Sequence, residues 1–451
     1  MDFFDYNKSG LMAEGVSVAR IAKEVGTPLY IYSQKTLQRH FSAFATAFES
    51  VPHLICYSVK ANSNLAVLRT FSDQGSGFDI VSGGELYRAI KAGADATKIV
   101  FSGVGKTDEE IEFAIKKKIL MFNVESPQEL RAINRVAKRL GTVAPFSIRV
   151  NPDVDPKTHA YISTGLKENK FGISVKDAVA EYAYALKSLK NLKAVGIDCH
   201  IGSQLTTVAP FIAALEKVKK LIVKLRKAGT EIKYLDMGGG IGITYDTEEP
   251  PLPSTYAEEV IKSTAGLDVT LVFEPGRVMA GNAGILVTKV IYTKESGKKR
   301  FVVVDAGMND LTRPSLYGSF HAIKPVRPKG RAEVKADIVG PICESGDFLA
   351  KDRKIEEVEP GELLAVMSAG AYGYTMASNY NSRPRPAEVM VVGKEFEVIR
   401  KRETVADLIR GEHAKLELNT PASNKKGAKR GARKGLKKRG AKKYRPQSED
   451  K

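Results

Sequence analysis

Cysteine is scarce in this 451-residue chain, which has only Cys56, Cys199 and Cys343. Three cysteines so far apart in the sequence can supply neither a disulfide framework nor the ligands of a metal cluster. We therefore expect a reducing compartment and predict no metal site.

Long apolar runs are also missing. The chain opens with Met-Asp-Phe-Phe-Asp, which has neither the basic start nor the apolar stretch of a signal peptide. Residues 363–382 carry no charge, but Gly, Ser, Thr, Asn and three tyrosines interrupt their apolar side chains. A membrane span is therefore not expected, and we predict a cytoplasmic protein.

Positive charge, by contrast, is abundant, but it is concentrated at one end. Residues 421–451 carry thirteen Lys and Arg against Glu449 and Asp450, a net +11 of the chain's +18. Residues 425–445 contain twelve of these cations, separated mainly by Gly and Ala. Such a segment cannot bury enough apolar surface to offset its ordering entropy. We predict a disordered basic tail over residues 416–451, in which residues 425–445 could bind nucleic acid or another anionic surface.

Strand-like and helix-like segments alternate along the first two thirds of the chain. The eight strand-like runs are residues 53–60, 77–82, 99–103, 120–125, 146–151, 196–202, 234–240 and 270–276. Segments with the helical spacing of apolar residues lie between most of them. Eight βα units in about 230 residues predict a closed (β/α)₈ TIM-type barrel, which we place at residues 35–281. An open, doubly wound parallel sheet is the alternative.

The pattern changes after residue 281. Strand-like runs at residues 285–293, 300–305, 333–339, 363–368 and 386–399 follow one another without helices of comparable length. We predict a mostly antiparallel β domain over residues 282–415, ending in a short helix near residues 404–410. Residues 1–34 are predicted to form an N-terminal segment that packs with this domain.

A lysine at the end of the first predicted barrel strand is the leading candidate for chemistry. Lys60 follows the apolar run that begins near Leu54, and the carboxyl ends of barrel strands form the active-site face of such folds. A buried amine tends to be paired or chemically used, and we expect burial to lower the pKa of Lys60. The alternative is an amine that simply reaches water.

Three further groups are predicted to meet Lys60 at the same face. They are His200, the glycines 238–240, and the turn from Glu274 to Arg277. The open backbone N–H groups of a glycine triplet suit a phosphate. The sixth position counted from Gly238 is Ile243, so the triplet is not a dinucleotide fingerprint.

A lysine without a nucleotide motif makes pyridoxal phosphate the favoured cofactor. Lys60 would hold it as a Schiff base, and Glu274 would keep its pyridine nitrogen protonated. His200 would stack against the ring, or would be an ordinary hydrogen-bonded core histidine.

Several motifs carry a family resemblance. They are Tyr57-Ser-Val-Lys-Ala-Asn62, Phe78-Asp-Ile-Val-Ser-Gly-Gly-Glu-Leu86, His200-Ile-Gly-Ser-Gln204, Glu274-Pro-Gly-Arg277, Arg313-Pro-Ser-Leu-Tyr317, Gly340-Pro-Ile-Cys-Glu-Ser-Gly-Asp347 and Gly370-Ala-Tyr-Gly373. In order and spacing, from about residue 25 to 410, the chain resembles the pyridoxal-phosphate decarboxylases of the alanine-racemase-like fold. Within that group it most resembles the diaminopimelate decarboxylases, which form lysine.

This resemblance implies roles for individual residues. The implied cofactor-binding residues are Lys60, Asp79, His200, Ser203, Gly239, Gly240, Glu274, Pro275, Gly276, Arg277 and Tyr372. The implied substrate-binding residues are Arg277, Arg313, Tyr317, Glu344 and Tyr372. Lys60 and His200 would be catalytic, together with Cys343, which would protonate the carbanion left by CO₂. It also implies a homodimer with shared active sites, in which Cys343 and Glu344 come from the neighbouring subunit.

Alternatives to this interpretation concern the substrate, the tail and Cys343. Related decarboxylases of ornithine, arginine and lysine typically have Asp after the catalytic cysteine, whereas this chain has Glu344. Polyanion binding through the basic tail is a function of another class. From residue type alone, Cys343 would be a small buried hydrophobic side chain.

Overall fold

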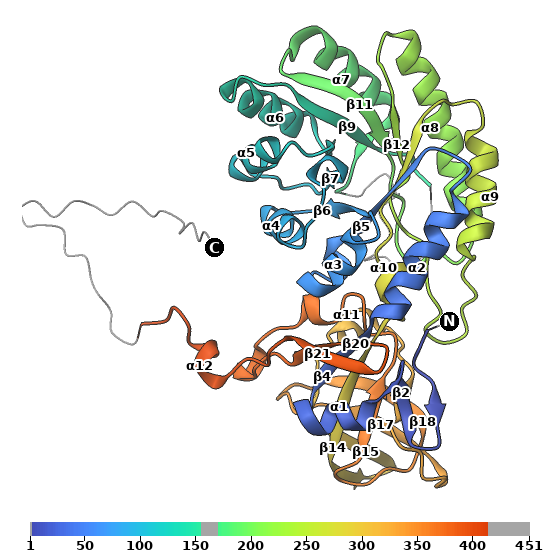
Figure 1. Cartoon of the computed structure of the whole chain (residues 1–451), viewed down its shortest axis with the longest axis vertical. Coiled ribbons are helices and arrows are strands. Elements are labelled where there is room, and N and C mark those ends of the chain that lie inside the picture. Colours follow the sequence, from blue (N-terminus) through green and yellow to red (C-terminus); the bar gives the residue numbers. More distant parts are fainter. Residues whose placement is uncertain (1, 155–169, 414–451) are drawn as a thin grey trace, which may run out of the picture. The chain divides into compact units, whose positions relative to one another are not determined.

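The computed structural model describes residues 2–154 and 170–413, and its first compact unit is Met1–Leu408. Eight parallel strands of this unit form a closed barrel (Figure 1). They are β5 (His53–Ser58), β6 (Gly77–Ile80), β7 (Ile99–Phe101), β8 (Met121–Val124), β9 (Ala144–Asn151), β11 (Leu192–Asp198), β12 (Tyr234–Asp236) and β13 (Thr270–Phe273). The circle is closed because β13 pairs with β5 in parallel register. The predicted barrel is confirmed, and the open sheet is wrong.

Helices surround the barrel strands (Figure 1). They are α2 (Gln34–Ala47), α3 (Leu65–Ser72), α4 (Gly83–Lys91), α5 (Asp108–Lys117), α6 (Pro127–Arg139), α7 (Val175–Ser188), α8 (Ala209–Lys227) and α9 (Pro253–Thr264). Capping side chains next to the first turn fix where α4 and α5 begin. The Ser82 side chain accepts the Glu85 N–H at the start of α4, and Thr107 forms a capping box with Glu110 at the start of α5.

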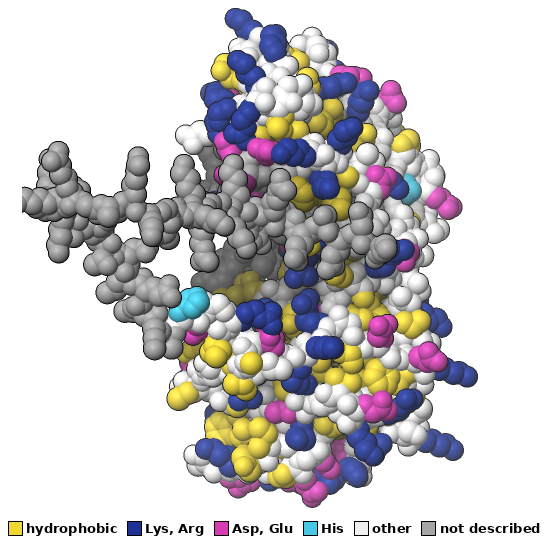
Figure 2. Space-filling view, turned by 60° about the vertical axis from the view of Figure 1, so that its left-hand side comes forward, with side chains coloured by type: hydrophobic (Ala, Val, Ile, Leu, Met, Phe, Trp, Pro, Cys, Tyr) yellow, Lys and Arg dark blue, Asp and Glu magenta, His cyan; other side chains and the backbone are white. Residues whose placement is uncertain are grey.

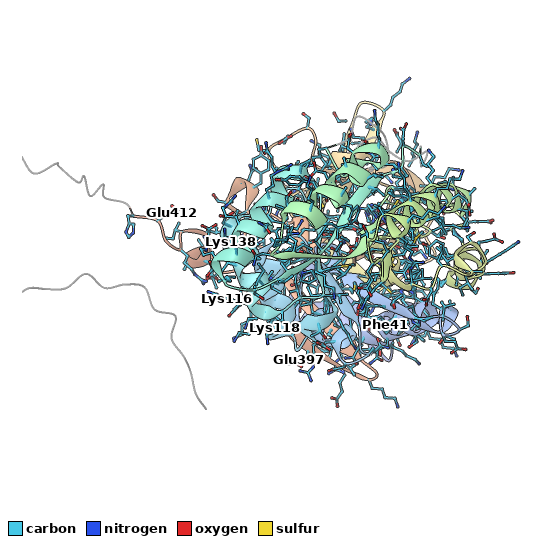
Figure 3. All side chains as sticks on the ribbon, turned by 90° about the horizontal axis from the view of Figure 1, so that it is seen from above. Phe41, Lys116, Lys118, Lys138, Glu397 and Glu412 are labelled. Atoms are coloured by element: carbon cyan, nitrogen blue, oxygen red, sulfur yellow. The ribbon has the colours of Figure 1, made fainter. Side chains whose placement is uncertain are left out.

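Lys and Arg side chains are numerous on the face of the molecule shown in Figure 2. On α5 and α6, several such cations pair with carboxylates. Lys116 and Arg139 both contact Glu112, and Arg135 contacts Asp108. Lys116, Lys118 and Lys138 project away from the barrel interior (Figure 3). Exposed pairs of this kind contribute little stability, so these helices are held mainly by their buried apolar faces.

The second part of this unit is a mixed sheet with the strand order β18-β17-β15-β14-β4-β20-β21. Its strands are β4 (Leu29–Ser33), β14 (Gly284–Ser296), β15 (Lys299–Val304), β17 (Glu333–Val339), β18 (Phe348–Glu356), β20 (Ala387–Val392) and β21 (Glu395–Arg400), with β16 (Ile323–Pro325) and β19 (Leu363–Val366) attached beside them. Most pairings are antiparallel, but β15 with β17 and β4 with β20 are parallel. The predicted fold class, a barrel with a mostly antiparallel β domain, is confirmed.

The N-terminal segment contributes directly to this sheet. Strand β4 lies between β14 and β20, although it is separated from both by more than 240 residues of the chain (Figure 1). The short strands β1 (Tyr6–Asn7), β2 (Gly10–Ala13) and β3 (Val16–Ser17) form a separate small sheet, followed by α1 (Val18–Val25). The buried side chains Leu29 and Ile31 of β4 join the apolar core formed with β14 and β20.

Some elements differ from those expected. Strand β18 and helix α1 were not predicted, and the run at residues 386–399 is two strands, β20 and β21, joined by a turn at Gly393. The final helix is α12 (Val405–Leu408). The predicted basic tail, including residues 425–445, lies outside the described residues. Within the described part of the chain, no helix is both long enough and apolar enough to cross a membrane.

The β domain holds the loop that follows the first barrel strand. Asn62 Nδ2 donates to the Gly370 carbonyl (3.1 Å), and the Tyr372 N–H donates to the Ala61 carbonyl (2.8 Å). Asn64 Nδ2 donates to the buried Glu388 carboxylate of β20 (2.8 Å). The turn that carries Lys60 is thus fixed by residues from both parts.

Candidate active site

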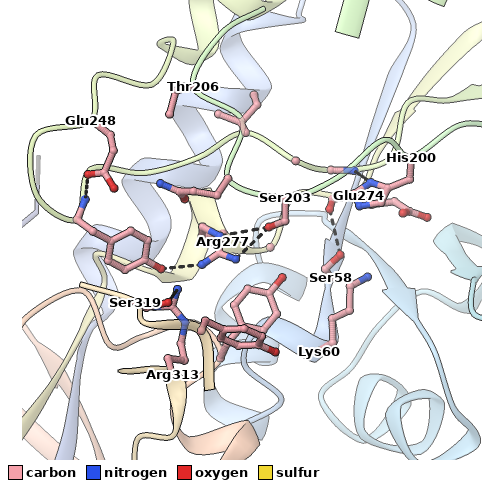
Figure 4. A pocket seen from close by; sticks show the side chains of 18 of the residues that line it. Ser58, Lys60, His200, Ser203, Thr206, Glu248, Glu274, Arg277, Arg313 and Ser319 are labelled. Atoms are coloured by element: carbon pink, nitrogen blue, oxygen red, sulfur yellow. Dashed lines mark hydrogen bonds between the residues drawn. The ribbon is translucent and has the colours of Figure 1, made fainter. Parts of the chain in front are cut away.

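A cavity of about 490 Å³ opens at the carboxyl ends of the barrel strands (Figure 4). Its walls come from both parts of the first unit. Of the predicted site residues, those that line it are Lys60, His200, Ser203, Gly239, Gly240, Glu274, Gly276, Arg277, Arg313, Tyr317 and Tyr372. The structure therefore brings most of the predicted site into one cavity.

Lys60 enters the cavity from the short 3₁₀ turn Val59–Ala61 that follows β5. Its Nζ donates to Oδ2 of the fully buried Asp79, which comes from β6, at 2.5 Å. Burial alone lowers the pKa of Lys60, but attraction to Asp79 and Glu274 outweighs it and leaves the pKa above its ordinary value. The expected lowering is therefore wrong, because the sequence did not reveal the buried partner.

Glu274 follows β13 and is almost completely buried. Its Oε1 accepts hydrogen bonds from Ser102 Oγ (3.0 Å) and Asn123 Nδ2 (3.1 Å). Burial, reinforced by the Asp79 charge, raises the pKa of Glu274 to about 7, although Lys60 and Arg149 oppose the shift. This carboxyl can therefore hold or release a proton near neutral pH.

A polar network inside the barrel supports Glu274 and was not predicted. Asn123 Nδ2 also donates to Asp236 Oδ2 (3.0 Å), and burial together with the Glu274 charge raises the pKa of Asp236. Arg149 Nη1 donates to Glu125 Oε1 (2.9 Å) nearby in the same interior. Asn123 and Asp236 sit in ordinary strand contexts, so only the inward alternation of β8 and β12 could have indicated them.

His200 lies against the glycine loop that follows β12. The Gly239 N–H donates to His200 Nδ1 (3.1 Å), which places the proton of a neutral ring on Nε2. Burial and the Arg149 charge lower the pKa of His200 well below its usual range. A Cβ on Gly238 would lie only 2.5 Å from His200 Nδ1, so glycine is required there by the packed ring. The amide of Gly239, predicted for a phosphate, is engaged by His200 here.

Arg277 begins the short helix α10 (Arg277–Ala280) and is 6% exposed. Its Nε and Nη2 donate to Ser203 Oγ (3.3 and 3.0 Å), and its Nη1 donates to the phenol oxygen of Tyr245 (2.8 Å). Its guanidinium also lies 4.9 Å from the Tyr372 ring centre. All these partners are neutral.

Arg313 enters from the β domain on helix α11 (Arg313–Tyr317) and is 5% exposed. Its Nη1 contacts His321 Nε2 (2.9 Å), and its Nη2 donates to Ser319 Oγ (3.3 Å). Its guanidinium lies 4.7 Å from the Tyr245 ring centre. Among the described residues, neither Arg277 nor Arg313 has a carboxylate partner. Two buried cations without anions are costly unless a ligand supplies the negative charge.

Tyr372 links the two parts of the cavity wall. Its backbone has φ 57°, a left-handed conformation that a tyrosine rarely adopts. The hydrogen bond from its N–H to the Ala61 carbonyl fixes this conformation next to the Lys60 turn. A Cβ on Gly276 would come within 3.3 Å of the Tyr372 hydroxyl and within 3.0 Å of Ser58 and Ala61, so glycine allows this close approach.

Four predicted residues do not line the cavity. Asp79 is buried beneath Lys60, and the Pro275 carbonyl accepts the Ser58 N–H (3.1 Å). Cys343 and Glu344 are exposed, and Glu344 Oε2 accepts the Tyr380 hydroxyl (2.8 Å). The interpretation of Cys343 as a buried hydrophobic side chain is therefore wrong.

Sequence reasoning missed several lining residues. They are Ser58, Phe171, Gln204, Thr206, Ile241, Tyr245, Glu248, Ser319, Phe320 and Met376. Most lie in loops, where neither strand nor helix periodicity marks them. Ser58 and Gln204 belong to the motifs around Lys60 and His200. Closeness in sequence to His200, the glycine triplet, Arg313 or Tyr372 could have drawn attention to most of the others, but not to Phe171.

Comparison with known proteins identifies the family. A model described as "Pyridoxal-dependent decarboxylase, pyridoxal binding domain" matches residues 34–281. Diaminopimelate decarboxylase of Pseudomonas aeruginosa is 52% identical over 412 residues, which cover 91% of this chain and 99% of that protein. The chain belongs to the diaminopimelate decarboxylase family.

Solved structures of the same family resemble the whole described fold. Diaminopimelate decarboxylase of Helicobacter pylori, complexed with L-lysine, is 46% identical with a TM-score of 0.84, covering 87% of this chain and 98% of that one. The enzyme from M. jannaschii, also in complex with L-lysine, is 39% identical with a TM-score of 0.87, covering 92% and 98%. The barrel and the β domain are thus features of the family.

The residues of the cavity fit the pyridoxal phosphate that this family implies. Lys60 provides an amine in the cavity, and Glu274 is a carboxyl with a pKa near 7. Glycines 239 and 240 line the cavity without side chains, and a Cβ on Gly239 would lie 2.3 Å from the Glu274 carbonyl. The two unpaired arginines supply positive charge for anionic groups.

Proposed function

We propose that this protein is a pyridoxal-phosphate-dependent decarboxylase that converts meso-2,6-diaminopimelate to L-lysine and CO₂, the last step of lysine biosynthesis, in the cytoplasm. Membership of the diaminopimelate decarboxylase family supports this reaction. The observation that carries it is a pair of buried arginines, Arg277 and Arg313, that contact no carboxylate in the described part of the chain and line the same cavity as Lys60 and Glu274. Such a site suits a ligand with more than one anionic group.

The barrel side of the cavity would hold the cofactor. Lys60 would bind it covalently, Glu274 would contact its pyridine nitrogen, and the His200 ring would lie against it. Ser203, Gly239, Gly240, the turn from Glu274 to Arg277, and Tyr372 would surround its phosphate. When bound, pyridoxal phosphate acts as the electron sink for the pair of electrons left by CO₂.

Glu274 and Asp79 would set the charge of the cofactor side. With a pKa near 7, Glu274 can share a proton with a ring nitrogen, and Ser102 and Asn123 orient its Oε1. Asp79 keeps Nζ of Lys60 directed by a 2.5 Å hydrogen bond. These side chains would thus hold both ends of the cofactor before substrate arrives.

The arginine side of the cavity would bind the substrate. Arg313 and Arg277 can each present a fork of N–H groups to a carboxylate, with Tyr317 and Tyr372 beside them. A substrate with two carboxylates and two amines would use these groups at one end while its other end reacts near Lys60. The related ornithine, arginine and lysine decarboxylases act on substrates with only one carboxylate.

Cys343 would deliver the final proton from a neighbouring subunit. Cys343 and Glu344 are exposed and do not line the cavity of their own chain. We propose a homodimer in which they complete the partner's cavity, where Cys343 Sγ donates a proton to the carbon that has lost CO₂ and Glu344 contacts a substrate amine. Mixing Lys60→Ala and Cys343→Ala subunits tests this arrangement, since hybrid dimers should regain activity that neither homodimer has.

The reaction itself is tested on purified protein loaded with pyridoxal phosphate. We expect CO₂ and lysine from meso-diaminopimelate, and a loss of at least about 10³-fold in Lys60→Ala. The absorbance of the lysine-bound cofactor should disappear in the same variant. Ornithine, arginine and lysine serve as competing substrates, and faster turnover of any of them would contradict the proposed substrate.

A further inference from the structure

His321 is a buried histidine at the arginine side of the cavity that the proposed reaction does not use. It is 0% exposed and lies between α11 and β16. Its backbone carbonyl accepts Arg353 Nη1 (2.8 Å), and its ring packs edge-on against Tyr245, with centroids 5.2 Å apart. Both its position and its ring orientation are therefore fixed.

The hydrogen bonds of His321 define its protonation state. Nδ1 lies 2.8 Å from the Met367 carbonyl, which can only accept, so Nδ1 carries a proton. Nε2 lies 2.9 Å from Arg313 Nη1, which can only donate, so Nε2 must offer its lone pair. The ring is a neutral acceptor. Burial and the Arg313 charge lower the pKa of His321 to about 3, in agreement with this geometry.

A neutral acceptor has a specific consequence for Arg313. An aspartate or glutamate in this place would orient the guanidinium equally well but would cancel its charge. His321 and the Ser319 hydroxyl hold two nitrogens of Arg313 and leave its full charge available. Arg149, equally buried, is instead paired with the carboxylate of Glu125.

We propose that His321 is a positioning residue that fixes the Arg313 guanidinium through an uncharged hydrogen bond, so that Arg313 keeps its charge for a substrate carboxylate. This inference rests on the proposed function, which places the substrate at Arg313. It adds that the uncharged character of the partner, and not only its presence, sets the affinity for the carboxylate.

A matched pair of variants separates position from charge. His321→Gln offers a neutral oxygen acceptor, whereas His321→Glu has nearly the same shape and adds a negative charge. In the holoenzyme, we expect the KM for meso-diaminopimelate to be at least about 10-fold higher in the Glu variant than in the Gln variant, with kcat values within about 3-fold of each other. Equal KM values in the two variants would overturn the proposal.

Ligand binding gives a second measurement that needs no turnover. L-lysine keeps one carboxylate after decarboxylation, whereas cadaverine has the same chain and amines but no carboxylate. By calorimetry on the holoenzyme, the Glu variant should bind L-lysine at least about 10-fold more weakly than the Gln variant, with no such difference for cadaverine. An equal loss for both ligands would overturn the proposal. Failure of the wild type to form lysine would instead contradict the proposed function.

A second pair of variants, at Ser319, tests the same idea if substitutions of the buried His321 prevent folding. Ser319 lines the cavity and is only partly buried. Ser319→Asp places a carboxylate beside Arg313 from the cavity side, and Ser319→Asn is its uncharged counterpart. The Asp variant should weaken L-lysine binding relative to the Asn variant by a similar factor. Equal affinities would overturn the idea that the uncancelled charge matters.

Discussion

The two sides of the cavity differ in how their buried charges are compensated. On the barrel side, Lys60 is paired with Asp79 and the Glu274 carboxyl is hydrogen bonded within the barrel interior. On the side next to the β domain, the hydrogen-bond partners of Arg277 and Arg313 among residues 2–154 and 170–413 are hydroxyl groups, a phenol and a neutral imidazole. Figure 4 shows Lys60 and Glu274 to the right of the arginines in this view. The positive charge on the barrel side is thus compensated by a carboxylate before any ligand binds. The positive charges on the arginine side depend on a ligand for their counter-charge.

Removing an unpaired arginine should produce the largest effect on the arginine side. Arg313→Met should raise the KM for meso-diaminopimelate by about 100-fold, because a charge-assisted carboxylate contact is lost. The same change should stabilise the ligand-free protein by about 1 kcal/mol, because it removes a buried charge that has no carboxylate partner among the described residues. Steady-state kinetics and denaturant unfolding measure the two effects.

Arg149 provides the matched control for this stability change. It is also buried, but it is paired with Glu125 at 2.9 Å. Arg149→Met should destabilise the protein by about 3 kcal/mol, because the buried Glu125 carboxylate loses its cationic partner. Equal losses of stability in both variants would contradict the contrast between the two sides.

Glu274→Gln should lower kcat by about 100-fold, because an amide cannot share a proton with the cofactor ring. It should also change the pH dependence of stability. The folded-state pKa of about 7 lies above the ordinary 4.5, so the native state binds more protons and wild-type stability falls as pH rises from 4.5 to 7. The Gln variant lacks this loss, so its advantage should grow across the same range to about 3 kcal/mol. Unfolding curves at several pH values measure it.

Glu85 is a useful comparison, because burial raises its pKa to about 7 as well, yet it does not line the cavity. Glu85→Gln should change stability with pH in the same direction while keeping kcat within about 3-fold of wild type. A pH-independent stability difference for Glu274→Gln would show that the carboxyl is ionised throughout this range.

Asp79→Asn should have a smaller effect, on the barrel side. The raised pKa of Lys60 means that its pairing stabilises the fold at all pH values below the ordinary lysine range, and that this contribution is lost as pH rises through the higher folded-state value. Because 40% of the Lys60 side chain is exposed, we expect a loss of only about 1 kcal/mol at pH 7. The pKa of Lys60 should fall, so cofactor uptake should become fast at lower pH than in wild type. Unchanged pH dependence of uptake would contradict the role of Asp79.

Deleting residues 421–451 should leave both sides of the cavity unchanged. We expect kcat and KM within about 2-fold of wild type, because the cavity residues named above all belong to the first compact unit, Met1–Leu408. Binding of RNA or DNA that weakens with salt should disappear in the same variant. Binding that survives the deletion would refute the proposed role of residues 425–445.

The repeating part of the fold was predictable, and long-range pairing was not. Eight apolar runs separated by helical segments predict the barrel because each βα unit shows its own periodicity. Strand β18 contains the run Lys351-Asp-Arg-Lys354, whose charges hide the strand pattern. The parallel pairing of β4 with β20 depends on residues more than 300 positions apart, which local periodicity cannot reveal.

The residues of the active site likewise include some that were predictable from the sequence and some that were not. Lys60, His200, Glu274 and Arg277 were predictable because they stand at strand ends or in recognisable motifs. His321 and Tyr245 were not, because neither stands at a strand end or in a recognisable motif. Their importance comes from hydrogen bonds to Arg313 and Arg277 and from the packing of Tyr245 against Arg313 and His321, which joins the barrel to the β domain. The direction of the Lys60 pKa shift also required the three-dimensional position of Asp79.

The place of β4 in the β sheet also affects how the protein is made. Leu29–Ser33 leave the ribosome early, but their neighbours Gly284–Ser296 and Ala387–Val392 are synthesised much later. Until then, the nascent chain carries an apolar strand with both edges unpaired, which can associate with other chains or recruit chaperones. The turn that carries Lys60 likewise cannot form its hydrogen bonds with Gly370, Tyr372 and Glu388 until those residues have been synthesised. A chain truncated before residue 370 would therefore lack a completed active site even if its barrel had closed.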